Sequence, residues 1–167
     1  MKTLYHGSDI AVKAPLTRAG RSNLDFGRGF YLTQIREQAE SRAQIIASRK
    51  GRRVIPILNV YSFDDETACN YRYKHFDCYD LEWLDYVIDC RQGGSKQDAF
   101  DIIEGGVAND NVIDTVEDYE KGIITAEQAL GQLRYKKVNH QLCIRNQEII
   151  DKCLKYIESV ELRPEED

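Results

Sequence analysis

Two short glycine-containing segments near the N-terminus constrain this chain more than any other feature. Tyr5-His6-Gly7-Ser8 ends an apolar strand-like stretch, and Gly27-Arg28-Gly29-Phe30-Tyr31 follows a polar loop. Glycine permits close backbone approach, so the neighbouring amides can bond a planar amide or a phosphate. His6 can donate or accept a hydrogen bond near neutral pH, and the Tyr31 ring offers a stacking face. The pair of segments predicts a pocket for a flat, hydrogen-bonding ligand.

Length and composition indicate one soluble domain. The chain has 167 residues and a net charge of −5, which suits a single well-buried domain over residues 1–167. No window approaches the roughly 18 apolar residues of a membrane span, and no apolar signal core follows Met1. We therefore expect a cytoplasmic protein without a membrane partner. Residues 163–167 are expected to be a frayed acidic tail.

The cysteines predict neither a disulfide framework nor a metal site. They are odd in number and scattered, without a Cys-x-x-Cys pair or a histidine at ligand spacing. We expect them to be reduced and mostly packed, with no structural zinc: Cys69, Cys78, Cys90, Cys143 and Cys153.

The charge pattern argues against nucleic-acid binding by bulk charge, because such binding depends on Lys and Arg. Two local basic patches remain, one over 42–53 and one over 134–137. The simpler interpretation, which we favour for most of these residues, is a solvated helix face or helix C-terminus. The basic residues are Arg42, Arg49, Lys50, Arg52, Arg53, Arg134, Lys136 and Lys137.

Hydrophobic periodicity and capping residues predict a mixture of strands and helices. Thr33 is expected to cap a helix, as are Asp80 and Thr125. Pro56 indicates either an edge strand or a strand start. The predicted strands cover 3–6, 54–63, 100–103 and 141–145, the predicted helices cover about 34–50, 80–88, 112–119 and 126–133, and 148–162 is a helix or strand pair.

The two N-terminal segments resemble the ADP-ribosyltransferase fold of the diphtheria-toxin and poly(ADP-ribose) polymerase branch, and in particular small bacterial members of it. The segments 100–103, 108–111 and 139–144 also match that group, although only Tyr5–Ser8 and Gly27–Thr33 are specific. The resemblance implies an α+β fold with a split β-sheet core and peripheral helices.

The resemblance also implies NAD as co-substrate and assigns residues to it. His6 would hold the adenosine-side ribose hydroxyl, and the Gly7 backbone would bond the nicotinamide carboxamide. Tyr31 would stack on the nicotinamide ring. Ser8 and Gly29 complete the backbone cradle expected around the dinucleotide.

At two positions the chain departs from the family pattern. Eleven residues after Tyr31, where the family often has a second aromatic residue, stands Arg42. A guanidinium can stack or pair with a pyrophosphate, so we count Arg42 among the cofactor-binding residues. Where the family places a catalytic Glu at the start of a late strand, this chain has Gln141.

A glutamine at position 141 can hold a ribose hydroxyl but cannot act as a general base. We therefore expect a single ADP-ribose transfer rather than polymer synthesis, with His6, Tyr31 and Gln141 as the catalytic set. His140 is the alternative to Gln141, and adjacent strand residues face opposite sides of a sheet. Another interpretation makes Gln141 a solvent-facing polar residue on an edge strand.

The resulting hypothesis is an NAD-dependent mono-ADP-ribosyltransferase that modifies a protein or nucleic acid. By family analogy it is a toxin restrained by a small antitoxin-like partner protein. An NAD-dependent RNA 2′-phosphotransferase uses the same fold and is a second hypothesis. A third is a catalytically silent module that binds NAD, ADP-ribose or a partner, which Gln141 and Arg42 favour.

Three further groups have weaker functional interpretations. The acidic run 64–66 could bind a divalent ion, but a loop before a helix explains it more simply. The turn 109–111 is a helix cap or an acceptor contact. His75 lies among aromatic residues that could stack on bases, although packing against the sheet is the simpler interpretation.

Overall fold

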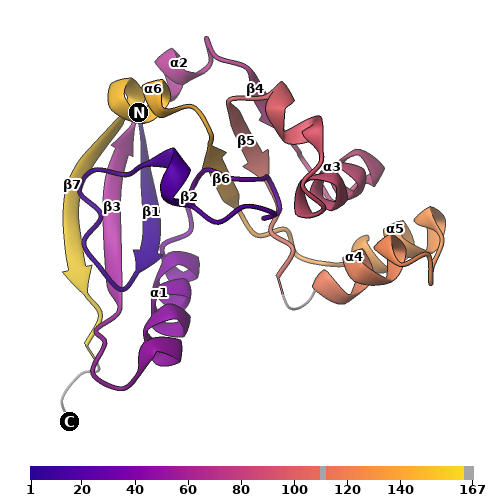
Figure 1. The fold of residues 1–167 in the computed structure, drawn as a ribbon, viewed down its shortest axis with the longest axis horizontal. Helices are drawn as coiled ribbons and strands as arrows, with labels where there is room; N and C mark the ends of the chain where they lie inside the picture. Colours follow the sequence, from indigo (N-terminus) through magenta and orange to yellow (C-terminus); the bar gives the residue numbers. More distant parts are fainter. Residues whose placement is uncertain (110–111, 164–167) are drawn as a thin grey trace.

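The computed structural model describes residues 1–109 and 112–163, which form two β-sheets and six α-helices (Figure 1). The strands are β1 (Lys2–Ser8), β2 (Phe30–Leu32), β3 (Ile57–Phe63), β4 (Tyr73–His75), β5 (Ile102–Gly105), β6 (Gln141–Ile144) and β7 (Leu154–Glu161). The helices are α1 (Arg36–Lys50), α2 (Asp65–Ala68), α3 (Leu81–Arg91), α4 (Ile113–Glu120), α5 (Ala126–Leu133) and α6 (Gln147–Cys153). This arrangement confirms the expected mixed α and β architecture.

The two sheets meet at β1 and β2. The first sheet has the order β1-β3-β7 and is antiparallel. The second has the order β2-β6-β5-β4, and only its β4–β5 pair is parallel. A bridge between Tyr5 and Thr33, with N–O distances of 2.8 and 2.9 Å, joins the sheets. β2 therefore lies between β1 and β6.

The core consists of two large apolar clusters, one for each face of the second sheet. One face packs on the first sheet through residues such as Leu4, Phe30 and Leu142. The other face packs on α3 and on the loop before β2, through residues such as Phe26, Trp83 and Cys143. All four residues of β6 are buried, because this strand has neighbours on both sides and layers on both faces.

Helix α1 packs on β1 through small residues. Ala39, Ala43 and Ala47 form its buried face. A Cβ atom at Gly7 would come within 2.0 Å of the Ala39 carbonyl oxygen. The close approach of the helix therefore requires glycine at position 7, independently of any ligand.

The helix starts at Asp80 and Thr125 are confirmed. Asp80 accepts a hydrogen bond from Trp83 N, and Thr125 forms a capping box with Gln128. The cap expected at Thr33 is wrong: α1 begins at Arg36, and Thr33 Oγ1 instead accepts from Ile35 N at 3.1 Å. Thr33 stays extended because its backbone pairs with Tyr5.

Several strand predictions need correction. Pro56 precedes β3, so it marks a strand start, but β3 is central and not an edge. The strand expected over 100–103 runs from Ile102 to Gly105, and the short β4 beside it was not expected. The segment 148–162 forms one helix followed by one strand. The tail residues 164–167 and the positions Asp110 and Asn111 lie outside the described residues.

Across the described parts of the chain, no helix combines the length and apolar character needed to cross a bilayer. All five cysteines are free thiols, and Cys90, Cys143 and Cys153 are buried. The packing of most of the cysteines agrees with the expectation, whereas Cys69 and Cys78 are exposed.

Candidate functional site

The predicted site residues His6, Tyr31 and Gln141 lie on three neighbouring strands, β1, β2 and β6. Two strand spacings separate His6 from Gln141, which is about 10 Å. No hydrogen bond or ring contact links these three side chains to one another in the described residues. The structure thus brings the three positions together around β2, and each side chain has its own surroundings.

The His6 imidazole is fixed in one tautomer. Its Nδ1 lies 2.7 Å from the Tyr31 carbonyl oxygen, which can only accept, so Nδ1 carries the hydrogen. The ring also packs on Phe30, with centroids 4.6 Å apart. Burial lowers the pKa of His6, and the nearby charge of Arg42 lowers it further. His6 is therefore a neutral imidazole whose Nε2 has no partner among the described residues.

The Tyr31 phenol forms hydrogen bonds with the backbone of the loop that precedes β2. Its hydroxyl donates to Gly27 O at 2.6 Å and accepts from Phe26 N at 3.0 Å. Burial raises the pKa of this phenol well above its usual value. Tyr31 is thus a neutral group that holds residues 26–27 in place.

Gln141 is buried, and β6 is an internal strand, so the interpretation as a solvent-facing edge residue is wrong. Its Nε2 donates to Gly106 O at 3.0 Å and to Asp25 Oδ2 at 3.2 Å. Asp25 is itself buried and pairs with Arg91 at 3.1 Å. Asp25 also accepts from Ala108 N at 2.9 Å.

His140 and Gln141 face opposite sides of the second sheet, as expected of consecutive residues. His140 Nε2 lies 2.6 Å from Glu104 Oε1, and its Nδ1 accepts from Gln34 N at 3.0 Å. The hydroxyl of Tyr73 donates to the other Glu104 oxygen. Because both ring nitrogens of His140 are occupied, it is a structural histidine rather than a free base.

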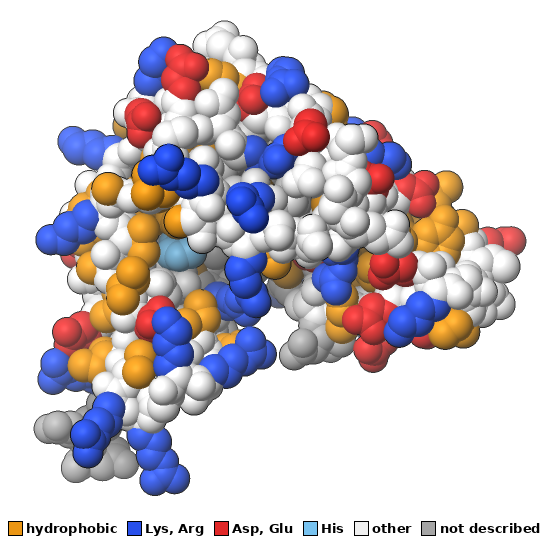
Figure 2. Space-filling model, in the orientation of Figure 1, with side chains coloured by type: hydrophobic (Ala, Val, Ile, Leu, Met, Phe, Trp, Pro, Cys, Tyr) orange, Lys and Arg blue, Asp and Glu red, His pale blue; other side chains and the backbone are white. Residues whose placement is uncertain are grey.

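An arginine cluster lies beside His6. Arg42 is an exposed residue; partial desolvation of its guanidinium lowers its pKa, and the positive charges of Arg21 and Arg49 lower it further. None of these three guanidinium groups pairs with a carboxylate of the described residues. Arg42 lies one turn after Gln38, whose side chain bonds the His140 backbone at 2.7 Å, so this side of α1 faces β6. Figure 2 shows Lys and Arg side chains along the α1 side of a notch in the molecule.

The remaining residues of the predicted cradle have structural contacts. A Cβ atom at Gly29 would lie 2.5 Å from Cys143 Sγ, so glycine at 29 lets β2 approach β6. Ser8 is buried, and its Oγ accepts from Ile10 N at 3.4 Å. These contacts explain the residue types at positions 8 and 29 without a ligand.

The other candidate groups also have structural partners. Asp64 caps α2 by accepting from Thr67 N, and Asp65 pairs with the N-terminal ammonium at 2.8 Å. His75 is exposed and lies 3.5 Å from both Asp77 and Glu104. Asn109 precedes α4, and its carbonyl accepts from Val112 N and Ile113 N, both at 2.8 Å.

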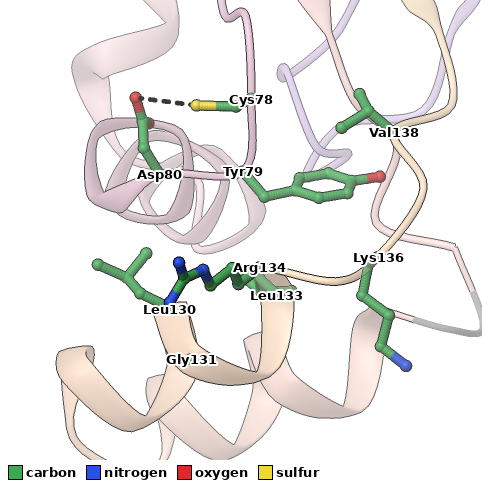
Figure 3. A pocket seen from close by; sticks show the side chains of 9 residues that line it. All are labelled: Cys78, Tyr79, Asp80, Leu130, Gly131, Leu133, Arg134, Lys136 and Val138. Carbon is green, nitrogen blue, oxygen red and sulfur yellow. Dashed lines mark hydrogen bonds between the residues drawn. The ribbon is translucent and has the colours of Figure 1, made fainter.

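A hollow of about 460 Å³ lies elsewhere, between the start of α3 and the end of α5 (Figure 3). Its lining residues are Cys78, Tyr79, Asp80, Leu130, Gly131, Leu133, Arg134, Lys136 and Val138. None of the predicted site residues lines it. The basic residues Arg134 and Lys136 thus belong to this hollow and not to the β1–β2–β6 junction.

Sequence reasoning missed Asp25, Arg91 and Glu104. Asp25 lies two residues before the second glycine-containing segment, but its partners Arg91 and Gln141 are 66 and 116 residues away. Glu104 belongs to no motif of the sequence, and its structural role becomes visible only from its burial within β5. The one available signal was an acidic residue at the end of a predicted apolar strand.

The fold and the junction define an α+β protein with a polar site where two sheets meet. A family model described as a protein of unknown function, DUF3990, matches residues 2–156. The chain belongs to this family. Comparison with curated proteins found no match, and neither did comparison with solved structures.

Proposed function

We propose that this protein is an NAD-dependent mono-ADP-ribosyltransferase, with the split-sheet ADP-ribosyltransferase fold. The observation that carries the proposal is the fixed His6 imidazole beside unpaired arginines. Tyr31 O holds Nδ1–H, so the neutral ring presents Nε2 as a hydrogen-bond acceptor. A ribose hydroxyl is the donor that such an acceptor binds.

The arginines would hold the charged part of the dinucleotide. Arg42 has neighbouring positive charges from Arg21 and Arg49 and no carboxylate partner among the described residues. Guanidinium groups suit a pyrophosphate because they bond its oxygens in pairs. A bound dianion would also relieve the mutual repulsion of the three cations. Arg42 thus fits a pyrophosphate contact in place of a second aromatic residue.

Bound NAD would supply a glycosidic bond whose cleavage releases nicotinamide with the bonding electron pair. The chain's own residues bind and orient: His6 accepts from one ribose hydroxyl, and Gln141 lies two strands away to accept from the other ribose. Gln141 cannot remove a proton from the acceptor, because its amide does not ionise, and His6 Nε2 is engaged by the ribose hydroxyl. The acceptor must therefore be nucleophilic already, or lose its proton to a group of its own.

The test is incubation with NAD labelled in its adenylate part and a cell lysate separated into protein, DNA and RNA. We expect label on one fraction with the wild type and with His75→Ala, a control at an exposed histidine. His6→Ala should lose at least about tenfold of the labelling, because one hydroxyl contact in the transition state is lost.

Other outcomes would replace the proposal. Free nicotinamide without any labelled macromolecule would indicate a hydrolase. Binding of NAD without turnover would indicate the silent module. No binding at all would show that NAD is not a ligand of this protein. Arg42→Gln should weaken NAD binding about tenfold or more. The control Arg36→Gln should not, because Arg36 pairs with Glu40 on the same helix.

The arginine cluster also favours a second candidate, the NAD-dependent RNA 2′-phosphotransferase. That reaction needs cations for an additional phosphate, and the positive charges of Arg21 and Arg49 act on Arg42. It predicts product only with 2′-phosphorylated RNA and none with the same RNA lacking that phosphate.

A further inference from the structure

The side-chain amide of Gln141 has only one orientation that its neighbours allow. Its nitrogen lies within hydrogen-bond distance of Gly106 O and Asp25 Oδ2, which both accept. Exchanging the amide nitrogen and oxygen would place three acceptors together and lose both bonds. The nitrogen must therefore face Asp25, and Oε1 must point away from it.

The amide oxygen, Gln141 Oε1, is the remaining polar atom of this side chain. It has no hydrogen-bond partner among the described residues. It is also not among their fully buried unpartnered side-chain atoms, a group that contains only the Tyr86 hydroxyl. Oε1 therefore retains contact with solvent, although the residue as a whole is only 7% exposed.

We propose that Asp25 is a positioning residue that makes Gln141 present a hydrogen-bond acceptor to a ligand hydroxyl. This inference rests on the proposed function for the identity of the donor, which would be the nicotinamide-side ribose hydroxyl. Asp25 acts through Gln141 and does not itself touch the ligand.

The surroundings of Asp25 support this role. Arg91 of α3 fixes Oδ1, while Ala108 N and Gln141 share Oδ2. Three separate parts of the chain thus hold the carboxylate in place. Gly106 O, the second partner of Gln141, is also fixed, because Trp83 Nε1 donates to it at 3.1 Å.

The same geometry explains why a glutamine stands at position 141. A glutamate there would place a second carboxylate beside Asp25 and an acceptor against Gly106 O. Like charges at this distance in a buried site repel strongly. With Asp25 present, the neutral side chain is the one that fits, and it still offers an acceptor oxygen to the ligand.

Thermal unfolding of single and double variants tests the pairing without any ligand. We expect Gln141→Glu to lower Tm by about 5 °C or more, because of the repulsion from Asp25. Asp25→Asn combined with Gln141→Glu should recover part of this loss. The control substitutions Gln44→Glu and Asp114→Asn, at exposed positions, should leave Tm unchanged. Equal Tm values for Gln141→Glu and the wild type would overturn the proposal.

Hydrogen exchange measures the amide orientation directly. The two Nε2 protons of Gln141 should be protected from exchange in the wild type. In Asp25→Ala, which removes the acceptor, they should lose protection while the backbone amides of β5 and β6 keep theirs. Unprotected side-chain protons in the wild type would overturn the proposal, whether or not NAD binds.

A ligand analogue separates positioning from general support of the fold. NAD lacking the nicotinamide-side 2′-hydroxyl should bind the wild type about tenfold more weakly than NAD. Asp25→Ala should lose this discrimination, whereas a purely structural defect would weaken both ligands equally. Equal weakening would overturn the positioning role, and absence of binding by the wild type would instead contradict the proposed function.

Discussion

The two residues at the start of β6 each contact a buried carboxylate, but on opposite faces of the second sheet. His140 bonds Glu104 on the face toward the first sheet, and Gln141 bonds Asp25 on the face toward α3. Both acidic residues are nearly inaccessible, with 4% of Glu104 and 9% of Asp25 exposed. Burial alone therefore does not distinguish the two clusters.

What differs is whether any polar atom remains available. In the Glu104 cluster both nitrogens of His140 are bonded, and both carboxylate oxygens have partners. In the Asp25 cluster the amide nitrogen of Gln141 is bonded twice, while its oxygen is free. A closed polar network stabilises the fold, and an open one has an atom left for a ligand.

The largest expected effect is on the closed network. Glu104→Ala should lower the free energy of unfolding by about 3 kcal/mol or more, because it leaves His140, Tyr73 and Gln34 without a buried partner. Urea unfolding measures this loss. Glu148→Ala is a matched control at an exposed ion pair and should cost less than about 1 kcal/mol.

Acid unfolding checks the same network without relying on a truncated side chain. Burial raises the pKa of Glu104, but hydrogen bonds from His140 and Tyr73 outweigh it and bring the pKa from 4.5 to about 2. A lowered carboxylate pKa stabilises the fold above pH 4.5, and this contribution disappears as the pH falls toward 2. Glu104→Gln should remove that part of the acid dependence. An unchanged profile would contradict the closed network.

Local sequence signals were sufficient where structure depends on neighbours along the chain. Asp80 and Thr125 begin helices because their side chains bond backbone amides three residues later. The opposite orientation of His140 and Gln141 follows from the alternation of a strand. The glycines of the two N-terminal motifs were also recognised, although for Gly7 and Gly29 the structure provides packing reasons.

Local signals failed where a residue depends on distant partners. The Asp25 carboxylate is defined by Arg91, Ala108 and Gln141, and no spacing in the sequence connects these positions. Thr33 has the residue type of a helix cap, yet its pairing with Tyr5 keeps it extended. The three residues of β4 are too few and too polar to produce a strand pattern, and they pair only because β5 lies beside them.

A smaller loss of stability is expected for the loop before β2, which contains Asp25. Tyr31→Phe should lower the free energy of unfolding by about 1–2 kcal/mol, because Gly27 O and Phe26 N lose their shared hydroxyl partner. The amide of Phe26 should also exchange faster with solvent. The control Tyr119→Phe removes a hydroxyl from a single bond of 3.2 Å to Asp85 and should change stability less. Equal losses in the two variants would show that the loop does not depend on Tyr31.

The smallest expected effect is the contribution of His6 to the pH dependence of stability. It acts at a higher pH than the contribution of Glu104. Burial and the charge of Arg42 lower the pKa of His6 below 6.5, so the folded protein resists protonation that the unfolded chain accepts. Stability should therefore fall as the pH drops below 6.5. This fall begins at a higher pH than the loss of the Glu104 contribution, which begins near pH 4.5. His6→Gln keeps a donor for Tyr31 O and should flatten the profile just below pH 6.5. If the His6→Gln and wild-type profiles coincide in that range, the imidazole is not held neutral, and the acceptor assigned to its Nε2 loses its physical basis.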